Sequence, residues 1–351
     1  MNLSALSDLV VKIMKTAVLL INLGTPDSPS TGNVRKYLTE FLNDPRVIDI
    51  SAIGRFLLVN GIIVPFRSPK SAKLYRHIWT DEGSPLLMHT KNLATKLQTA
   101  LGDKFVVEFA MRYQNPGIKT VLEKLRQQKP SKIVIIPLYP QYASSSTGST
   151  IEKLFDELKH WEVIPSISII SKFYDDENYI KAFVEEGAKH NMAEYDHVLF
   201  SYHGLPERHI KKGAAHYGSD YCQLSDKCCS TINQSNQYCY RANCYYTTRE
   251  IAKQLNIPKE KYSVSFQSRL NNKWVKPFSD EVIKEKAKQG IKRMLVFSPA
   301  FVADCLETIY EIGTEYNEIF REHGGEKIEF VKSLNSNDTW VQALKNMALK
   351  A

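Results

Sequence analysis

The stretch VLFSYHGLPERHI, residues 198–210, is the part of the sequence from which the fold can be inferred. Its apolar start, residues 198–200, is typical of a buried strand, and Gly204 and Pro206 are turn signals that end it. His203 therefore lies at the carboxyl end of a strand. In parallel α/β sheets ligands bind just outside that end, so His203 is a candidate functional residue. Taken alone, it is more often a structural histidine.

Strands of the same kind lie on both sides of this one and alternate with amphipathic helical patterns. The predicted strands are 16–24, 105–113 and 132–140 in the first half and SISIISKFY (166–174), 197–203, 262–269 and 293–301 in the second. The predicted helices include 88–101, 117–128, 177–190, 279–289 and 335–349. This alternation predicts an α/β fold of two similar doubly wound domains, each a parallel sheet flanked by helices, with a cleft between them.

The segment 299–320 carries five carboxylates and no Lys or Arg, in a chain of formal net charge +8. Glu307, Glu311 and Glu315 are spaced i, i+4, i+8, which stacks them on one face of a helix. Like charges so placed repel, and divalent cations are natural partners for them. A solvated acidic helix face is the alternative interpretation.

Taken together, SYHGLPER and PAFVADCLETIYEI resemble the ferrochelatase family. Further pieces match the same family in the same order: INLGTP (21–26), RSPK (67–70), RYQNP (112–116), PLYPQYASSSTGS (137–149) and FQSR (266–269). The resemblance implies a chelatase-like fold and the insertion of ferrous iron into protoporphyrin IX, which gives protohaem. Two alternatives remain open: a chelatase for another tetrapyrrole (coproporphyrin III or sirohydrochlorin), or a non-catalytic iron–sulfur or haem-binding protein.

The resemblance places the catalytic pair, His203 and Glu307, on opposite walls of the cleft. Metal insertion removes two pyrrole protons, and a buried imidazole is a suitable base for this near neutrality. Together with His203 and Glu307, the carboxylates of Glu311 and Glu315 would hold or pass on the substrate Fe²⁺ or its protons. Cys305 stands where the family often has a second histidine.

The resemblance also assigns residues to the porphyrin site, which needs apolar walls and cationic or hydroxyl partners for the propionates. Leu23 is expected at the lip of the porphyrin site and Trp274 as one of its aromatic walls. Arg112 and Tyr113 are expected to line the inner pocket. The candidate propionate partners are Arg67, Lys70, Ser84 and Ser268.

The longest apolar segment, FLLVNGIIVPF (56–66), is followed by Arg67, Lys70 and Lys73. It is either a core helix or an apolar lip that contacts a greasy ligand or the membrane surface, with cations beside it for anionic groups. Because RSPK belongs to the family pattern, the lip is favoured, and peripheral contact with the membrane is expected. No stripe of Lys and Arg interleaved with aromatic residues predicts nucleic-acid binding.

Five of the six cysteines lie within 23 residues: Cys222, Cys228, Cys229, Cys239 and Cys244. In a chain without a secretory signal this density indicates a metal site, and four thiolates bind either zinc or an iron–sulfur cluster. Some ferrochelatases carry such a segment with a [2Fe–2S] cluster, and the resemblance implies one here. Zinc, or free thiols with no metal, are the alternatives.

The chain of 351 residues is long enough for two domains. We expect a short N-terminal extension (1–15), a first domain (16–166 with a returning helix, 334–351) and a second domain (167–333). The second domain would include the cysteine-rich insertion, about 214–244. The start of the chain is a poor signal peptide, so a cytoplasmic protein, peripheral to the inner face of the membrane, is expected. Both a monomer and a homodimer fit the sequence.

Overall fold

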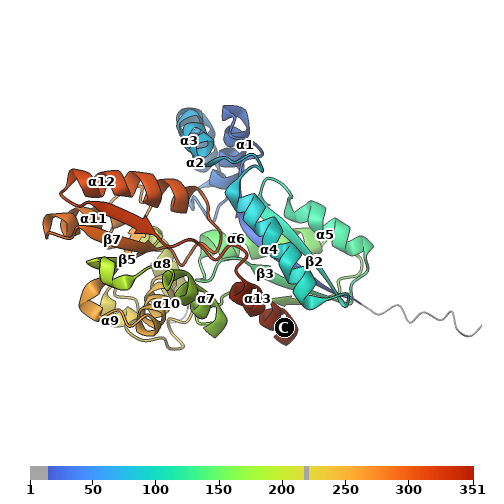
Figure 1. Ribbon diagram of the computed structural model, residues 1–351. Coiled ribbons are helices and arrows are strands. Elements are labelled where there is room, and N and C mark those ends of the chain that lie inside the picture. Colours follow the sequence, from blue (N-terminus) through green and yellow to red (C-terminus); the bar gives the residue numbers. More distant parts are fainter. Residues whose placement is uncertain (1–14, 217–220) are drawn as a thin grey trace, which may run out of the picture.

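Two four-stranded parallel sheets organise the described residues, 15–216 and 221–351, of the computed structural model (Figure 1). The first sheet, in the order β2-β1-β3-β4, consists of β1 (Thr16–Gly24), β2 (Phe105–Tyr113), β3 (Lys132–Pro137) and β4 (Ser166–Ile169). The second, in the order β6-β5-β7-β8, consists of β5 (His197–His203), β6 (Tyr262–Gln267), β7 (Arg293–Phe297) and β8 (Lys327–Phe330). The predicted α/β class is confirmed. Of the predicted extension 1–15, only Lys15 lies among the described residues.

The central strand of the first sheet shows why the sheet is covered on both faces. Val18 and Leu20 of β1 belong to one apolar cluster, whereas Leu19 and Ile21 belong to another. Successive side chains of a strand point to opposite faces, so each cluster lies on its own side of the sheet. A parallel sheet buried on both faces reads as a continuous apolar run, which is what residues 17–21 show.

Helices surround both sheets (Figure 1). With the first half of the chain lie α1 (Thr31–Leu42), α2 (Ala52–Phe56), η2 (Leu57–Ile63), α3 (Val64–Ile78), α4 (Pro85–Leu101), α5 (Ile118–Gln127), η3 (Ser144–Gly148) and α6 (Ser149–Leu158). With the second half lie α7 (Glu177–Gly187), η4 (Met192–Glu194), α8 (Glu207–His216), α9 (Asp226–Cys229), α10 (Tyr240–Gln254), η5 (Lys259–Lys261), α11 (Ser279–Lys288), η6 (Glu307–Tyr316) and α12 (Asn317–Glu322), and then α13 (Asp338–Lys350).

Helices α2, η2 and α3, residues 52–78, form a unit that we call the lip. Figure 1 shows it with α1 above the boundary between the two sheets. Its inner side packs with α1 into a cluster that also takes up Leu306, Ile309 and Tyr310 from the second half of the chain. Its outer side is apolar and exposed, with the side chains of Ile53, Phe56, Leu57, Ile62 and Phe66 facing solvent. The exposure favours the lip interpretation of residues 56–66 over a core helix.

One predicted strand was assigned to the wrong sheet. The segment 166–174 was expected to start the second group of strands, but Ser166–Ile169 pairs with β3 at the edge of the first sheet. Its short alternating pattern carries no information about which neighbour it pairs with. Strand β8 was not predicted, because KIEF is a short run with two charges. The other predicted strands begin at the expected residues.

The C-terminal helix α13 packs against both α4 and α7, which come from different halves of the chain. The domain boundaries expected from the sequence stay a prediction. In the described part of the chain, none of the helices has the length and apolar character needed to cross a membrane.

Candidate active site

His203 is the last residue of β5, a central strand paired with β6 and β7 on either side. Its ring centroid lies 6.4 Å from that of Trp274 and 6.4 Å from that of Phe301. Its Nδ1 atom lies 2.7 Å from the carbonyl oxygen of Gly204. A carbonyl only accepts, so Nδ1 carries the hydrogen and Nε2 of the neutral ring keeps its lone pair.

Burial lowers the pKa of His203, while the nearby Glu307 carboxylate raises it and the Arg67 guanidinium lowers it further. The net direction is downward, because the charged imidazolium is disfavoured in a site shielded from water. The ring is therefore held in the neutral form that can accept a proton. Arg67 is brought to this side of the site by α3.

Position 204, beside His203 and Trp274, has no room for a side chain and therefore requires glycine. A Cβ atom at position 204 would lie 2.7 Å from the carbonyl oxygen of Gln267 and 3.1 Å from the Trp274 ring. Pro206 forms an isolated bridge with Trp274, and the Val275 N–H donates to the Leu205 carbonyl over 2.9 Å. Trp274 is thus fixed to the segment that follows His203, and its role as an aromatic wall of the porphyrin site stays a prediction.

The three stacked carboxylates lie on η6, which is a π-helix rather than the expected α-helix. Glu311 is held by the second sheet: Gln267 Nε2 donates to its Oε2 over 2.9 Å, and Ser268 Oγ donates to the same atom over 2.8 Å. Burial raises the pKa of Glu311 to about 7 despite these hydrogen bonds, and the neighbouring carboxylates add to the rise. Burial likewise raises the pKa of Glu315. Burial is the main cause of both raised pKa values, and the neighbouring carboxylates add to it, as expected for like charges stacked on one helix face.

The start of η6 is fixed by Asp304, which is 6 % exposed. Its carboxylate accepts hydrogen bonds from the Ser333 N–H over 3.0 Å and from Asn335 Nδ2 over 2.8 Å. Asn335 Oδ1 in turn accepts from the Asp304 N–H over 2.8 Å. These contacts tie Glu307 to the chain after β8, and the acidic run gave no sign that Asp304 had a different role from the glutamates.

Two buried phenols, Tyr37 of α1 and Tyr75 of α3, lie within electrostatic range of Glu307. Burial is the largest cause of the raised pKa of both, and the Glu307 carboxylate raises each further. The rings make an edge-on contact with centroids 6.3 Å apart. Neither was singled out from the sequence. Tyr75 lies eight residues after Arg67, about two helical turns farther along the same face of α3. That spacing could have identified Tyr75 from the sequence as a candidate site residue.

The predicted inner-pocket residues Arg112 and Tyr113 are brought together at the end of β2. Both contact the buried Asp44: Arg112 Nη2 lies 2.6 Å from Oδ2, and the Tyr113 hydroxyl donates to the same atom over 2.9 Å. Ser149 Oγ also donates to this oxygen. Asp44 was not predicted, although it lies in the turn that separates α1 from the lip.

The residues expected to contact the porphyrin differ in how exposed they are. Leu23 packs against the lip cluster at the end of β1, and Arg67 and Lys70 stand exposed on α3. Ser84, by contrast, is buried and accepts a hydrogen bond from Thr25 over 2.8 Å, and the Ser268 hydroxyl is engaged with Glu311. Their roles toward propionates stay predictions.

Four of the five clustered cysteines lie in or directly before α9 and α10. Cys228 and Cys229 end α9, with their sulfurs 3.9 Å apart, and Cys239 is the N-cap of α10. Cys222 lies within electrostatic range of Cys228 and Cys229, and Arg241 Nη1 donates to Cys229 Sγ over 3.1 Å. Cys244 is fully buried inside α10. Over residues 15–216 and 221–351, no three His, Cys, Asp or Glu side chains are placed so that they could hold a metal ion.

The chain is similar to known proteins over nearly its whole length. The family model described as Ferrochelatase matches residues 15–351. The chain is 46 % identical over 335 residues to a ferrochelatase of Legionella pneumophila (strain Lens), covering 95 % of this chain and 98 % of that protein. It is 42 % identical over 344 residues to a ferrochelatase of Coxiella burnetii (strain Dugway 5J108-111), covering 96 % and 94 %. Among solved structures, the fold is similar to the cobalt complex of the sirohydrochlorin chelatase SirB from Bacillus subtilis subspecies spizizenii, with a TM-score of 0.52, 13 % identity and coverage of 96 % and 95 %.

Proposed function

The chain belongs to the ferrochelatase family, and from this we propose how its residues share the insertion of ferrous iron into protoporphyrin IX. The enzyme inserts a metal into a porphyrin in haem synthesis. In this reaction Fe²⁺ replaces two pyrrole hydrogens, which leave as protons. The protein must therefore take up protons in a dry site and deliver an ion stripped of its water.

His203 is the proposed first base. The observation that carries this proposal is its Nδ1 contact with the Gly204 carbonyl, which leaves Nε2 free to accept a proton. Burial lowers its pKa, so the ring is neutral before the reaction, and the Glu307 carboxylate stabilises the imidazolium that forms. Trp274 and Phe301 keep the ring oriented.

Glu307, Glu311 and Glu315 are the proposed path for protons or for the substrate iron. Glu311 suits this role because its pKa of about 7 lets it bind or release a proton near neutrality at little cost. The hydrogen bonds from Gln267 and Ser268 hold its carboxylate in place in either state. The carboxylates are also suitable oxygen ligands for a divalent ion that has lost its water.

The lip and Trp274 are the proposed walls of the porphyrin site, with Arg67 and Lys70 as partners for its propionates. The exposed apolar face of the lip supports contact with a membrane surface, from which a greasy porphyrin could enter and to which haem could leave. We infer a cytoplasmic protein that is peripheral to the inner face of the membrane. Protoporphyrin IX and Fe²⁺ are its proposed small-molecule partners.

The experiment that tests the activity is anaerobic insertion of Fe²⁺ into three tetrapyrroles: protoporphyrin IX, coproporphyrin III and sirohydrochlorin. The proposal requires protoporphyrin IX to have the highest kcat/KM. Preference for another tetrapyrrole would keep the reaction but change the substrate. Binding of porphyrin or haem without any insertion would make the protein a carrier.

We also propose that four of Cys222, Cys228, Cys229, Cys239 and Cys244 hold a [2Fe–2S] cluster. The chemistry of the donor set fits, because four thiolates bind such a cluster and all five thiols lie on one segment. The described side chains do not gather three ligands in one place, so the ligating set is open. When bound, the cluster would supply a rigid cross-link for a polar segment. Zinc and free thiols are the alternatives.

A further inference from the structure

The loop at residues 43–51 links α1 to the lip and contains two carboxylates with separate partners. Near its start, Asp44 is held by Arg112 and Tyr113 at the end of the first sheet. Near its end, Asp49 turns away from the first sheet. Because the lip begins at Ala52, the contacts of Asp49 determine where the base of the lip lies.

Asp49 contacts three polar side chains of α8, a helix from the second half of the chain. Arg208 Nε donates to its Oδ1 over 2.7 Å, Lys212 Nζ donates to its Oδ2 over 2.5 Å, and His209 Nε2 lies 3.2 Å from Oδ1. The Asp49 side chain is only 14 % exposed. Burial alone would raise its pKa, but the hydrogen bonds from Arg208 and Lys212 hold the pKa well below the usual range. Asp49 therefore stays charged.

Helix α8 is connected directly to the segments that carry His203 and Trp274. It begins four residues after His203, and its first N–H, that of Glu207, donates to the Lys273 carbonyl over 3.0 Å. Pro206 is bridged to Trp274. A shift of α8 would therefore move Trp274 and the segment that follows His203.

A cavity of about 440 Å³ borders the contact between the loop and α8. Pro45, Arg46 and Asp49 of the loop line part of it, and His209, Lys212 and Gly213 of α8 line another part. The rest of its lining is largely apolar or aromatic and includes Leu205, Ile210, Tyr142, Tyr238 and Tyr240. Beside this space, the polar contacts of Asp49 directly restrain the distance between the two segments.

We propose that Asp49 is a positioning residue for the porphyrin. It fastens the base of the lip to α8 and so sets the gap between the lip and the wall formed by His203 and Trp274. This inference rests on the proposed function, because it assumes that the porphyrin lies in that gap. The Fe²⁺ carboxylates stand on η6, which also packs against the lip, but Asp304 holds the start of η6 through the chain after β8 rather than through α8. Loss of the Asp49 contacts should therefore affect porphyrin binding first.

The test is Asp49→Asn, which keeps the size of the side chain and removes its charge. We expect the KM for protoporphyrin IX to rise about fivefold, as for the loss of a small network of partly exposed ion pairs, with the KM for Fe²⁺ unchanged. Asp49→Glu should recover most of the loss. The porphyrin KM should rise with salt more steeply in the wild type than in Asp49→Asn, because the variant has already lost one screened contact while the proposed contacts of Arg67 and Lys70 with the propionates remain.

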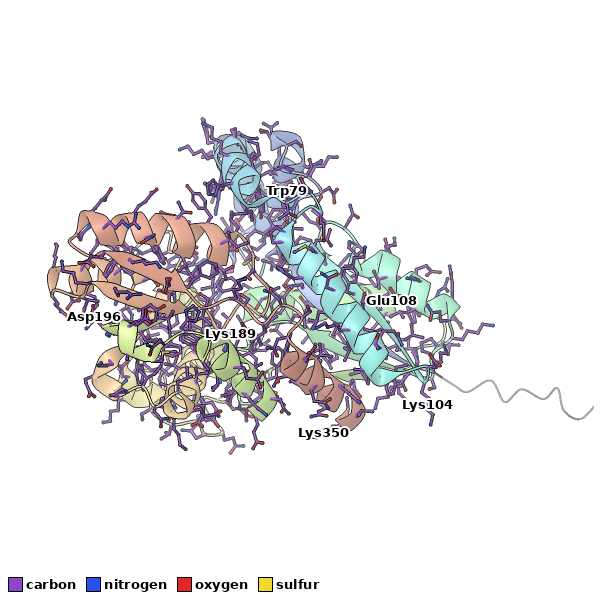
Figure 2. All side chains as sticks on the ribbon, viewed as in Figure 1. Trp79, Lys104, Glu108, Lys189, Asp196 and Lys350 are labelled. Carbon is purple, nitrogen blue, oxygen red and sulfur yellow. The ribbon has the colours of Figure 1, made fainter. Side chains whose placement is uncertain are left out.

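Glu194→Gln is the matched control. It removes the ion pair with Arg293 at 3.0 Å within the second half of the chain. Figure 2 shows the nearby Asp196 at the outer end of that half, far from Trp79, which follows the lip. This variant should keep both KM values.

Hydrogen exchange of the amides in loop 43–51 and α8 gives a readout that needs no turnover. In Asp49→Asn both segments should exchange faster, even if the wild type proved inactive with every porphyrin. Lys212→Met removes one exposed partner without a risk to folding, and it should shift exchange and porphyrin KM in the same direction by less. Unchanged exchange and unchanged porphyrin KM in both variants would overturn the proposal. A rise in the KM for Fe²⁺ as large as the rise in the porphyrin KM would also overturn it.

Discussion

At the scale of single residues, His203 combines a free Nε2, a neutral ring and a fixed orientation. We predict that His203→Ala lowers kcat for both Fe²⁺ and Zn²⁺ insertion by about 10²–10⁴-fold, the usual contribution of a general base. Steady-state assays with protoporphyrin IX measure this. His190→Gln is the control, since that ring lies against Tyr195, outside the cleft. If His203→Ala kept more than about a tenth of wild-type turnover, another group would have to be the base.

The carboxylates on η6 should differ in their effects. We expect Glu307→Gln to lose the chemical step, because Glu307 is the carboxylate that interacts with His203. Glu311→Gln and Glu315→Gln should chiefly raise the KM for Fe²⁺, because they stand farther along the helix. Three variants with wild-type kinetics would show that the face is only an acidic surface.

The raised pKa of Glu311 also predicts that the stability of the protein depends on pH. Its folded-state pKa of about 7 lies above the 4.5 of a solvent-exposed glutamate, so the native state binds more protons than the unfolded state between these values. Stability therefore falls as pH rises through this window, by about 3 kcal/mol at most. The Glu311→Gln variant has no carboxyl group at this position, so it should not lose this stability as pH rises. We expect the variant to gain stability relative to wild type as pH rises from 5 to about 8, as measured by urea unfolding. A difference that does not vary with pH would contradict the raised pKa.

At the scale of elements, the sequence located the strands well, because buried parallel strands are short apolar runs that end in Pro or Gly. The end of β5 and its histidine could be predicted for that reason. The pairing of Ser166–Ile169 could not, because the choice of neighbouring strand depends on contacts across the chain. Asp44, Asp49 and Asp304 were missed for a related reason: each carboxylate acts through partners distant in sequence, and nothing nearby distinguishes them from ordinary surface acids.

The π-helical form of η6 could not be predicted either. The i, i+4, i+8 spacing is compatible with both helix types, and only the packed structure decides between them. The hydrogen bond of Ser268 shows the same limit. The family pattern suggested a propionate partner, and nothing in the sequence indicated that the hydroxyl donates to Glu311.

The lip carries a prediction at this scale. Phe56 and Phe66 are 62 % and 73 % exposed, so they should insert into the membrane surface without supporting the core. We expect Phe56→Ser with Phe66→Ser to lower binding to vesicles that contain anionic lipid, as measured by sedimentation, with thermal stability retained. Phe155→Ser, on α6 and 54 % exposed, is the matched control. Equal vesicle binding by all three proteins would exclude the lip as the membrane contact.

At the scale of the whole molecule, the walls of the proposed porphyrin site come from both halves of the chain. The lip belongs to the first half, and His203, Trp274 and η6 belong to the second. Contacts across this boundary are made by Asp49 on one side and by the packing of α13 against α4 and α7 on another. The substrate site is therefore sensitive to changes in the second half that lie outside the cleft.

The cysteine segment is the most direct way to observe this sensitivity. Cys239 caps α10, and the next residue, Tyr240, donates its hydroxyl hydrogen to the His203 carbonyl over 2.9 Å. Loss of the proposed metal from the segment should loosen the start of α10 and with it the backbone of His203. We predict that anaerobic chelation lowers both the Tm and the insertion rate. A loss of about 2 kcal/mol would lower the Tm of the affected half by roughly 4–8 °C.

Iron and acid-labile sulfide analysis of anaerobically purified protein, with its visible absorption spectrum, identifies the metal before chelation. Two irons and two sulfides per chain are expected for the proposed cluster. Cys305→Ser is the control, because Cys305 lies beside Glu307 and away from the segment, so the metal content should not change. Colourless active protein with stoichiometric zinc would replace the cluster with a structural zinc site. Protein with neither metal, and with a Tm that does not respond to chelator, would show that these cysteines are free thiols and that α10 is held by packing alone.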